Sequence, residues 1–562
     1  MPSGSELFVR SLRSQGVENL FTLVGDHLND VLRAAVREGM SVYDTRHESA
    51  AVHMADGWSR LTRTPGVSMV TGAPGHTNSI TGIATAHATA APLLAVSGMS
   101  DSSARDRGAF QDMDQLKLVQ GITKYAAVPA RSGQIPFHVK RAFLEMLRGR
   151  PGAAHLSIPA DHFTERNETH APIPDQRIEA SRSAPASADL DRVMDLLAAS
   201  ERPAVVAGSG AYWSRAEREL RSFVEAVNAP LFTATLARGL VSDDHPLCFG
   251  YADAAINPAF GNALRKADLV LVVGKRMDYG LGLGGPQLFG AGAKTVQIDV
   301  CGTELGMNRA LEVGIHADAK TTLAAFNEAL AARTSPERGR WLAEVQRGRD
   351  EYAARIAAEM AVPRLPLHSL HVYEVLRDKL PPDATVCWDG GDFVHWGRYM
   401  LSACQPGRWM RLGSLAGLGV GLPIGLSAQI LRPDSKSVVI TGDGSLGFYI
   451  GELDTAVRHG LPLAIIVGND AGWGVERELQ KGRYPGAPAV ACELRNTRYD
   501  LVMKAFGGDG VHVTERAQLP DAFERAFRSE KPFLVNIEIA GLGSPYTRYQ
   551  TGQRKRQARH AP

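Results

Sequence analysis

Two aspartates that follow apolar segments are the residues of this sequence best suited to bind a metal ion. Asp443 lies in the turn 442–445, directly after the apolar segment 437–441, and Asp470 follows a second apolar segment. Glycines in such a turn let backbone amides approach a phosphate, and carboxylates are ligands that Mg²⁺ prefers. The carboxyl ends of parallel strands meet at one sheet edge. We therefore expect Asp443, Asp470 and the Gly472 carbonyl to converge on one ion, although these residues alone also fit a capped tight turn.

The whole stretch GDGSLGFYIGELDTAVRHGLPLAIIVGND resembles the thiamine-diphosphate fingerprint of pyruvate-decarboxylase-like and acetolactate-synthase-like enzymes. The family has an asparagine pair after the second strand, and this chain has Asp470 where the second asparagine stands. An aspartate is an oxygen ligand of the same size with an added charge. The resemblance implies thiamine diphosphate and Mg²⁺ as cofactors, with the metal held by Asp443, Asp470 and Gly472. The diphosphate contacts that it implies are Gly442, Gly444 and Ser445.

A segment near the N-terminus, RHESAAVHMADG from Arg46 to Gly57, is similar to the family pattern RHE-x-A-A-x-x-M-A-x-G. The resemblance implies that Glu48 activates the coenzyme by holding a proton at the far nitrogen of its aminopyrimidine ring. Without the family, Glu48 would be interpreted as an exposed helix acid, the usual state of glutamate. In this family the activator and the metal ligands come from different subunits. The resemblance therefore implies a homodimer as the smallest active unit and a homotetramer as the expected assembly.

The glycine-rich segment RLGSLAGLG, from Arg411 to Gly419, resembles the family segment that bends the coenzyme into a V shape. The resemblance implies that Leu418 is the bulky residue beneath the bend and that the Ala416 carbonyl accepts from the pyrimidine amine. Leu418 could instead be ordinary core, the commonest state of a leucine.

Two further segments narrow the branch of the family. Phe110 to Gln115, FQDMDQ, resembles a loop of acetolactate synthases and oxalyl-CoA decarboxylases, which implies that Gln111 faces the substrate. The twin histidines of pyruvate decarboxylase are absent. Arg498 to Gly510 is similar to the segment RYD-x-x-M-x-A-F-G-G-x-G of oxalyl-CoA decarboxylases and 2-hydroxyacyl-CoA lyases. The substrate implied by this second segment is a CoA thioester.

A basic tail over residues 546–562 resembles the C-terminal lid of those CoA-ester enzymes. Coenzyme A carries several phosphate charges, and arginine can bind phosphate through two parallel hydrogen bonds. A frayed chain end is the alternative interpretation. The CoA-binding candidates are Arg408, ahead of the glycine-rich segment, and Arg548, Arg554, Lys555 and Arg556 in the tail.

Departures from the decarboxylase pattern favour a lyase. Phe110 and Gly474 stand where oxalyl-CoA decarboxylases carry tyrosines, and Glu493 stands where related segments are apolar. An acid at that position could take the proton of a 2-hydroxyl group and so assist carbon–carbon cleavage. Glu476 is the competing proton carrier, and an exposed loop acid is the alternative interpretation of Glu493.

These departures resemble the actinobacterial lyases that act on 2-hydroxyisobutyryl-CoA. The activity implied is cleavage of the C1–C2 bond of a 2-hydroxyacyl-CoA to formyl-CoA and a ketone or aldehyde. The alternatives are an oxalyl-CoA decarboxylase and an acetolactate-synthase-like carboligase. A coenzyme-binding regulator without activity would need a defective site, whereas the activator and both metal-binding aspartates are present.

The middle of the chain has features of a nucleotide site. Gly208 and Gly210 follow the apolar segment 204–207, and Asp299 ends the apolar segment 296–298, where an acid can bind ribose hydroxyls. Relatives hold FAD or ADP here, and Arg150, Arg276 and Asp318 match positions near that site. The subfamily resemblance favours ADP over FAD, and a nucleotide-fold domain that binds neither is the remaining alternative.

These residues must be positioned by α/β domains, because short apolar segments alternate with longer helix-like stretches along the chain. The sequence predicts three doubly wound parallel-sheet domains over residues 1–170, 188–335 and 366–545, followed by a C-terminal lid over 546–562. Polar and Pro-rich stretches separate them, and the charged segment from Glu337 to Glu359 is predicted to form a solvated helix.

Composition excludes several other classes of protein. The chain has 562 residues, 44% of them apolar, and a net charge of +2, which gives no bulk attraction to nucleic acid or an anionic membrane. We find no apolar stretch long enough to span a membrane and no N-terminal signal peptide. Five scattered cysteines form no Cys-x-x-Cys pair. The sequence therefore predicts a large globular protein of the reducing cytoplasm.

Overall fold

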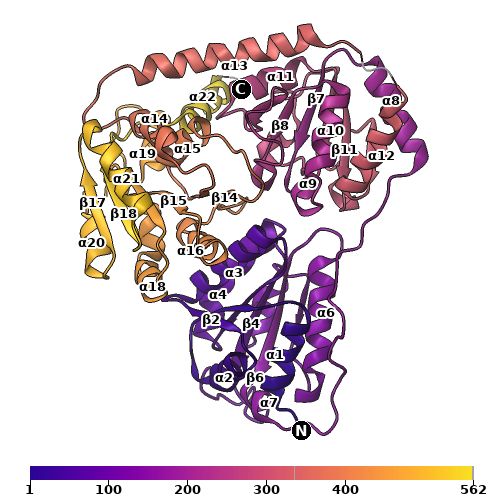
Figure 1. Ribbon diagram of the computed structural model, residues 1–562, viewed down its shortest axis with the longest axis vertical. Coiled ribbons are helices and arrows are strands. Elements are labelled where there is room, and N and C mark those ends of the chain that lie inside the picture. The colour runs from indigo at the N-terminus through magenta and orange to yellow at the C-terminus, as the bar shows by residue number, and fades with distance from the viewer. Residues whose placement is uncertain (334–335, 560–562) are drawn as a thin grey trace.

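The computed structural model describes residues 1–333 and 336–559 of the chain, with only the backbone described from residue 553 onward. Three six-stranded sheets, in each of which the paired strands run parallel, dominate the described residues (Figure 1). The predicted fold class, α/β with three parallel-sheet domains, is confirmed.

The first sheet has the strand order β2-β1-β3-β4-β6-β5. Its strands are β1 (Asn19–Thr22), β2 (Ser41–Asp44), β3 (Gly66–Val70), β4 (Leu93–Met99), β5 (Tyr125–Ala127) and β6 (Ala153–Pro159). Its helices are α1 (Gly4–Ser14), α2 (Asn29–Arg37), α3 (Glu48–Thr62), α4 (Pro74–Ala88), α5 (Gln115–Val119), α6 (Ile135–Leu147) and α7 (Ala160–Thr164).

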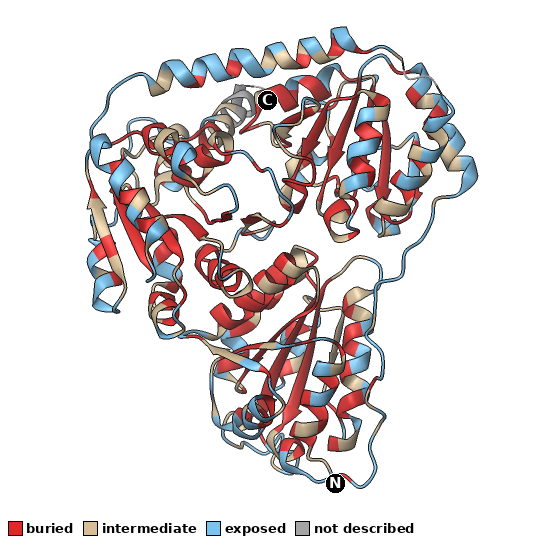
Figure 2. Ribbon diagram, viewed as in Figure 1, coloured by how far each residue is buried: buried red, intermediate tan, exposed pale blue. Residues whose placement is uncertain are grey.

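The central sheet has the order β12-β11-β10-β7-β8-β9. Its strands are β7 (Pro203–Ala207), β8 (Leu231–Thr233), β9 (Cys248–Tyr251), β10 (Leu269–Val273), β11 (Lys294–Asp299) and β12 (Val313–His316). Its helices are α8 (Ser187–Ala199), α9 (Ser209–Trp213), α10 (Glu217–Val227), α11 (Pro258–Lys266) and α12 (Ala319–Ala331). The predicted charged helix is α13 (Gly339–Met360), which runs along one side of the molecule from the central to the third domain and is largely exposed (Figures 1 and 2).

The third sheet has the order β14-β13-β15-β16-β18-β17. Its strands are β13 (Thr385–Trp388), β14 (Trp409–Arg411), β15 (Ser437–Gly442), β16 (Ala464–Asn469), β17 (Asp509–Val513) and β18 (Phe533–Glu538). Its helices are α14 (Ser369–Lys379), α15 (Asp392–Met400), α16 (Gly421–Leu431), α17 (Asp443–Leu446), α18 (Glu452–Arg458), α19 (Gly474–Arg483), α20 (Tyr499–Ala505), α21 (Leu519–Arg528) and the C-terminal α22 (Pro545–Arg559).

Alternating side chains of the central strands enter two different cores, which explains why these strands are mostly apolar. In β15, Val438 and Ile440 belong to the core under α14 and α21, whereas Val439 belongs to the core on the opposite face. The same alternation occurs in β4, where Leu93 and Leu94 enter different cores. Helices must therefore cover both faces of each sheet, and the sheets are buried (Figure 2).

The first and third domains meet through α3 and α16, which pack closely beside each other (Figure 1). A Cβ on Gly57 would lie 3.0 Å from the Ile424 Cα, so the missing side chain permits the close approach. Ser427 Oγ donates to the Met54 carbonyl at 2.7 Å. One apolar core contains residues of all three sheets. The carboxyl edge of the third sheet is thereby fixed relative to the other two domains.

No helix in residues 1–333 or 336–559 combines the length and the apolar character that crossing a membrane requires.

Candidate active site

A cavity of about 540 Å³ lies at the carboxyl edge of the third sheet, against the central domain. It is built by the turns that follow β13, β14, β15 and β16, because the carboxyl ends of parallel strands share one edge. Nine residues expected from the sequence to bind the coenzyme, the metal or a proton line it. They are Ala416, Leu418, Gly442, Asp443, Gly444, Ser445, Asp470, Gly472 and Glu476.

The turn from β15 into α17 brings its backbone against neighbouring residues. A Cβ on Gly444 would lie 2.7 Å from the Trp473 ring, so a side chain at this position would collide with the indole. Asp443 is only 1% exposed and Ser445 only 4% exposed. A tight glycine turn around a buried acid suits a phosphate group bound through a cation.

Asp443 and Asp470 face each other closely enough to share a hydrogen bond. Asp443 Oδ2 also accepts from the Gly472 amide at 3.0 Å. Burial raises the pKa of Asp443, and burial together with repulsion from Asp443 raises the pKa of Asp470 to about 7. Two buried carboxylates that repel each other are the electrostatic setting that a divalent cation relieves.

The donor set fits Mg²⁺ if main-chain and phosphate oxygens complete it. Among residues 1–333 and 336–559, no cluster of three or more histidine, cysteine, aspartate or glutamate side chains could hold a metal ion. Two carboxylates alone do not satisfy a six-coordinate ion, but Mg²⁺ commonly takes one or two carboxylates plus substrate phosphates. The residues present therefore fit a metal that arrives with a diphosphate.

Arg477, on α19, is a site residue that the sequence analysis did not identify. Its guanidinium pairs with Asp470 at 2.5 Å and with Glu493 at 3.4 Å, and its side chain is largely buried. It therefore links the metal-site acids to one of the two proton-carrier candidates. No sequence pattern reveals this contact, because Arg477 stands in a polar helix like many surface arginines.

Asp389, directly after β13, is a second residue that the sequence analysis missed. Its carboxylate accepts backbone hydrogen bonds from Gly390 at 2.8 Å, Gly419 at 2.9 Å and Gly421 at 3.0 Å. Burial raises its pKa to about 6. The three bonds fix the turn that presents Leu418 and Ala416 to the cavity.

The geometry of that turn is tight. Ala416 has a φ of 57°, in the left-handed region that non-glycine residues rarely adopt. A Cβ on Gly390 would lie 2.4 Å from Leu418 Cδ2, so Leu418 rests directly on the Gly390 backbone. Leu418 is half-buried and lines the cavity.

Glu48 begins α3 and is half-buried, and its Oε2 accepts from Asn78 Nδ2 at 2.9 Å. Gln111 lies in the segment between β4 and α5 with a φ of 58°. Within the described part of the chain, neither residue lines the cavity that contains Asp443. Within one chain, Glu48 and Asp443 thus do not share this cavity.

The two proton-carrier candidates differ in position. Glu476, in the first turn of α19, lines the cavity. Glu493 forms an isolated antiparallel bridge with Gly472, its side chain is 68% exposed, and it is absent from the cavity lining given by the described residues. Glu493 thus stands outside the cavity, beside the metal-site loop.

A second cavity, of about 970 Å³, lies between all three domains. Five residues of the expected nucleotide site line it: Arg150, Gly210, Arg276, Asp299 and Asp318. Gly208 lies beside it, where a Cβ would meet Lys275 Cβ at 2.6 Å. Asp299 is buried at the end of β11, as a ribose-binding acid would be.

Two of these nucleotide-site residues also have structural partners. Asp318 caps α12 by accepting from the amides of Lys320 and Thr321. Arg276 pairs with Glu304 at 2.9 Å. The capping bond accounts for Asp318 without a ligand, whereas Arg276, with its side chain 39% exposed, keeps a face toward the cavity.

The expectation that Arg408 binds coenzyme A needs correction. Arg408 immediately precedes β14, and its guanidinium is bonded to the Asp383 carbonyl and to Ser435 Oγ. This is the amino edge of the third sheet, opposite the cavity. A single arginine before a glycine-rich segment does not reveal which sheet edge it occupies, and here its hydrogen bonds are used within the fold.

Of the coenzyme A-binding candidates in the tail, the structure describes the side chain of Arg548 alone. Arg548 lies on α22, where it pairs with Glu359 of α13 through bonds of 2.6 and 2.9 Å and stacks over the Trp396 ring at 4.9 Å. In this state its charge is engaged within the chain. The side chains of Arg554, Lys555 and Arg556 lie outside the described residues.

Comparison with known proteins identifies the family. The chain matches, in order, the models "Thiamine pyrophosphate enzyme, N-terminal TPP binding domain" (residues 2–118), its central domain (190–326) and its C-terminal TPP binding domain (389–537). It is 33% identical to a probable acetolactate synthase of Mycobacterium bovis, over 94% of each chain. A 2-hydroxyacyl-CoA lyase of Oryza sativa is 30% identical over 98% of this chain and 97% of its own, and the human 2-hydroxyacyl-CoA lyase 1 is 29% identical over 96% and 94%. The chain therefore belongs to the thiamine pyrophosphate enzyme family and is a thiamine-diphosphate-dependent enzyme.

Proposed function

We propose that the enzyme is a lyase that cleaves the C1–C2 bond of a 2-hydroxyacyl-CoA. The products are formyl-CoA and a ketone or aldehyde, and the substrate that we propose is 2-hydroxyisobutyryl-CoA. The observation that carries this proposal is the pair of acids, Glu476 and Glu493, on the two segments that flank the metal-site loop. Two relatives named 2-hydroxyacyl-CoA lyase, matched over nearly their whole length, support it.

The chain's own residues would bind and orient the coenzyme, which supplies, when bound, an electron sink for breaking a carbon–carbon bond. Asp443 and Asp470 would hold Mg²⁺, with Gly442, Gly444 and Ser445 around the diphosphate. Leu418 and Ala416 would orient the rings. Glu48 of the partner subunit would hold a proton at the ring nitrogen, which makes a homodimer necessary, and we infer a homotetramer as the full assembly.

We infer that Glu493 takes the proton of the substrate's 2-hydroxyl group. Arg477 draws the Glu493 carboxylate toward Asp470, and the bridge with Gly472 keeps it beside the metal-site loop. The exposed Glu493 side chain leaves room for a bound substrate, and α22 or a second subunit would then cover that substrate. Glu476 is the competing acid because it already lines the cavity.

The remaining ligands belong to the same proposal. Arg548 and the basic tail residues would contact the coenzyme A phosphates, with Arg548 leaving Glu359 to do so. The 970 Å³ cavity would hold ADP, and a yellow purified protein would argue for FAD instead. All five cysteines are free thiols, which agrees with a reducing cytoplasm.

The decisive experiment is a product assay. Purified enzyme with thiamine diphosphate and Mg²⁺ is expected to release acetone and formyl-CoA from 2-hydroxyisobutyryl-CoA. Carbon dioxide from oxalyl-CoA would reassign it as a decarboxylase. Acetolactate from pyruvate would favour the second candidate, a carboligase, which the 33% identity with the mycobacterial synthase supports.

Glu48→Gln tests the activator. The substitution keeps the size of the side chain and its contact with Asn78, so folding and coenzyme affinity should stay within about twofold while turnover falls at least about a hundredfold. Turnover and coenzyme titration are measured side by side. Full turnover in this variant would contradict the assignment.

A further inference from the structure

A buried carboxylate from the third domain reaches the segment that leads into Glu48. Glu452, at the start of α18, is 1% exposed, and its two oxygens accept from the Arg46 amide at 3.1 and 3.2 Å. The His47 amide and the Thr455 hydroxyl, the latter at 2.6 Å, also donate to it. Glu452 thus contacts the two residues that immediately precede the proposed activator.

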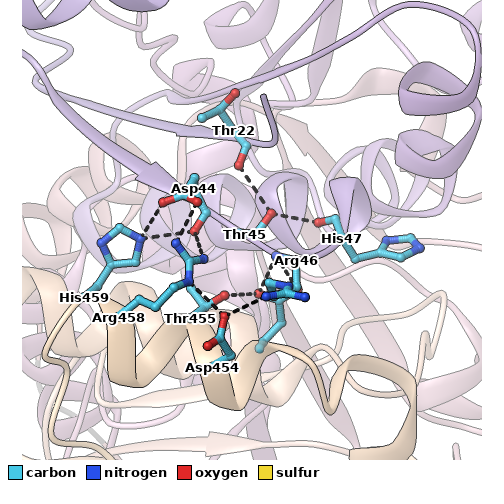
Figure 3. A network of polar contacts seen from close by, with 10 residues as sticks. Thr22, Asp44, Thr45, Arg46, His47, Asp454, Thr455, Arg458 and His459 are labelled. Atoms are coloured by element: carbon cyan, nitrogen blue, oxygen red, sulfur yellow. Dashed lines mark hydrogen bonds and ion pairs between the residues drawn. The ribbon is translucent and has the colours of Figure 1, made fainter. Parts of the chain in front are cut away.

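Exposed ion pairs surround this contact (Figure 3). Arg46 pairs with Asp454 at 3.1 Å, Arg458 pairs with Asp44 at 2.7 Å, and His459 contacts Asp44 at 3.1 Å. Partly exposed pairs of this kind contribute little each, typically ~0–1 kcal/mol. The buried Glu452 contact is therefore the one expected to fix the segment.

A second contact lies on the C-terminal side of Glu48. Tyr449, in the turn before α18, donates from its hydroxyl to Ser49 Oγ at 3.0 Å. His47 caps α3 by accepting from the Ser49 amide at 3.1 Å. Residues 449–455 of the third domain thus hold the backbone just before Glu48 and the Ser49 side chain just after it.

A buried carboxylate is costly unless hydrogen bonds to it compensate for lost hydration, and here burial raises the pKa of Glu452. An apolar residue would pack at this position without that cost, but it could not accept from two backbone amides. The role that explains an acid here is control of the backbone geometry at Arg46 and His47.

We propose that Glu452 is a positioning residue for the coenzyme activator: through the amides of Arg46 and His47 it sets the orientation of Glu48. The proposal rests on the proposed role of Glu48. Glu452 itself does not line the cavity that contains Asp443, as the described residues give it. A misplacement of about 1 Å can cost roughly a hundredfold in rate, so loss of this contact should reduce activation strongly.

Glu452→Gln is the principal test, with Asp454→Asn as its matched control two residues along the same helix. Glu452→Gln keeps the size of the side chain but replaces one acceptor oxygen with an NH₂ donor. One oxygen remains to accept, and the NH₂ group would face a backbone donor of Arg46 or His47, so the substitution weakens the contact with this segment. Asp454→Asn alters only partly exposed ion pairs, one with Arg46 and one with Arg458.

Three measurements report on the position of Glu48. In Glu452→Gln we expect kcat to fall at least about tenfold, with KM and coenzyme affinity within about twofold of the parent. Exchange of the C2 proton of bound thiamine diphosphate in D₂O should slow in parallel, and backbone amide exchange at residues 46–49 of the coenzyme-free protein should speed up. Asp454→Asn should change none of these by more than about twofold.

A merely structural role would give a different result. If Glu452→Gln lowers the unfolding temperature but leaves C2 exchange and kcat per folded enzyme within about twofold of the parent, the proposal is wrong. If Glu452→Gln fails to fold, Thr455→Val is the alternative test, because it removes only the hydroxyl bond to Glu452. This substitution should lower kcat severalfold at unchanged KM. An unchanged kcat would then overturn the proposal.

Glu48→Gln, run in parallel, separates this inference from the function on which it rests. Loss of C2 exchange in Glu48→Gln together with normal exchange in Glu452→Gln would reject the positioning role alone. Normal exchange in Glu48→Gln would reject the activator assignment itself.

Discussion

At the scale of single residues, the most informative departure from the family is Asp470. The family carries an asparagine there, and the extra charge faces Asp443 in a buried setting that raises the pKa of Asp470 to about 7. A metal ion needs the ionised carboxylate, so protons compete with it below that pH. The affinity for Mg²⁺ and the diphosphate should therefore rise with pH until about 7 and then level off.

The prediction is quantitative. Because one proton competes, affinity should fall about tenfold for each pH unit below 7. Asp470→Asn, which restores the family's residue, should remove this part of the pH dependence and keep binding at pH 8 within severalfold. Calorimetric titration of Mg²⁺ and thiamine diphosphate into both proteins from pH 6 to 8 measures it. An equally steep profile in Asp470→Asn would contradict the account.

The sequence revealed some site residues and not others for a physical reason. Asp443 and Asp470 follow predicted strands, and the parallel topology then determines that they meet. Asp389 and Arg477 act through partners in other segments: the Gly419 amide lies 30 residues from Asp389, and Glu493 lies 16 residues from Arg477. Such contacts leave no local pattern, and Arg408 was misjudged for the same reason.

At the scale of elements, the turn from β14 to α16 depends on one side chain, Asp389. Asp389→Ala would leave three buried amides without their acceptor, at a cost of ~1–3 kcal/mol for each unsatisfied group. Removing the buried carboxylate also removes its own desolvation cost, so we expect the free energy of unfolding to fall by about 2–4 kcal/mol, less than the sum of the three costs. Coenzyme binding should weaken, because Leu418 and Ala416 lose their fixed backbone.

Urea unfolding of the coenzyme-free protein and titration with the coenzyme measure the two effects. Asp389→Asn keeps one acceptor oxygen and should lie between the parent and Asp389→Ala. If Asp389→Ala unfolds at the parent's urea midpoint, the three hydrogen bonds do not fix the turn.

Central strands were predictable because burial on both faces makes them nearly continuous apolar segments, as in β10 and in Ala464 to Val467 of β16. The short edge strands β2, β5 and β14 were not, since each has only three or four residues. The charged helix α13 was predictable from composition, but its path between domains was not, because that path depends on where the two sheets lie.

At the scale of the whole molecule, the proposed dimer takes Glu48 of each chain into one site and Asp443 of the same chain into the other. Glu48→Gln and Asp443→Asn should each be inactive alone. Coexpressed in one cell, they should form mixed dimers with one intact site, and random pairing gives about a quarter of parental activity. Two differently tagged copies allow the mixed dimer to be purified and assayed. No recovery of activity would show that each site takes both residues from one chain.

The apolar interior that passes without a break through all three sheets has a consequence for how the polypeptide can be divided. Removing the central domain would expose apolar surface on that domain and on the remaining chain. Such fragments should aggregate rather than fold. The protein should consequently melt in one cooperative step, and a circularly permuted or split version should survive only if its pieces reassemble that shared interior.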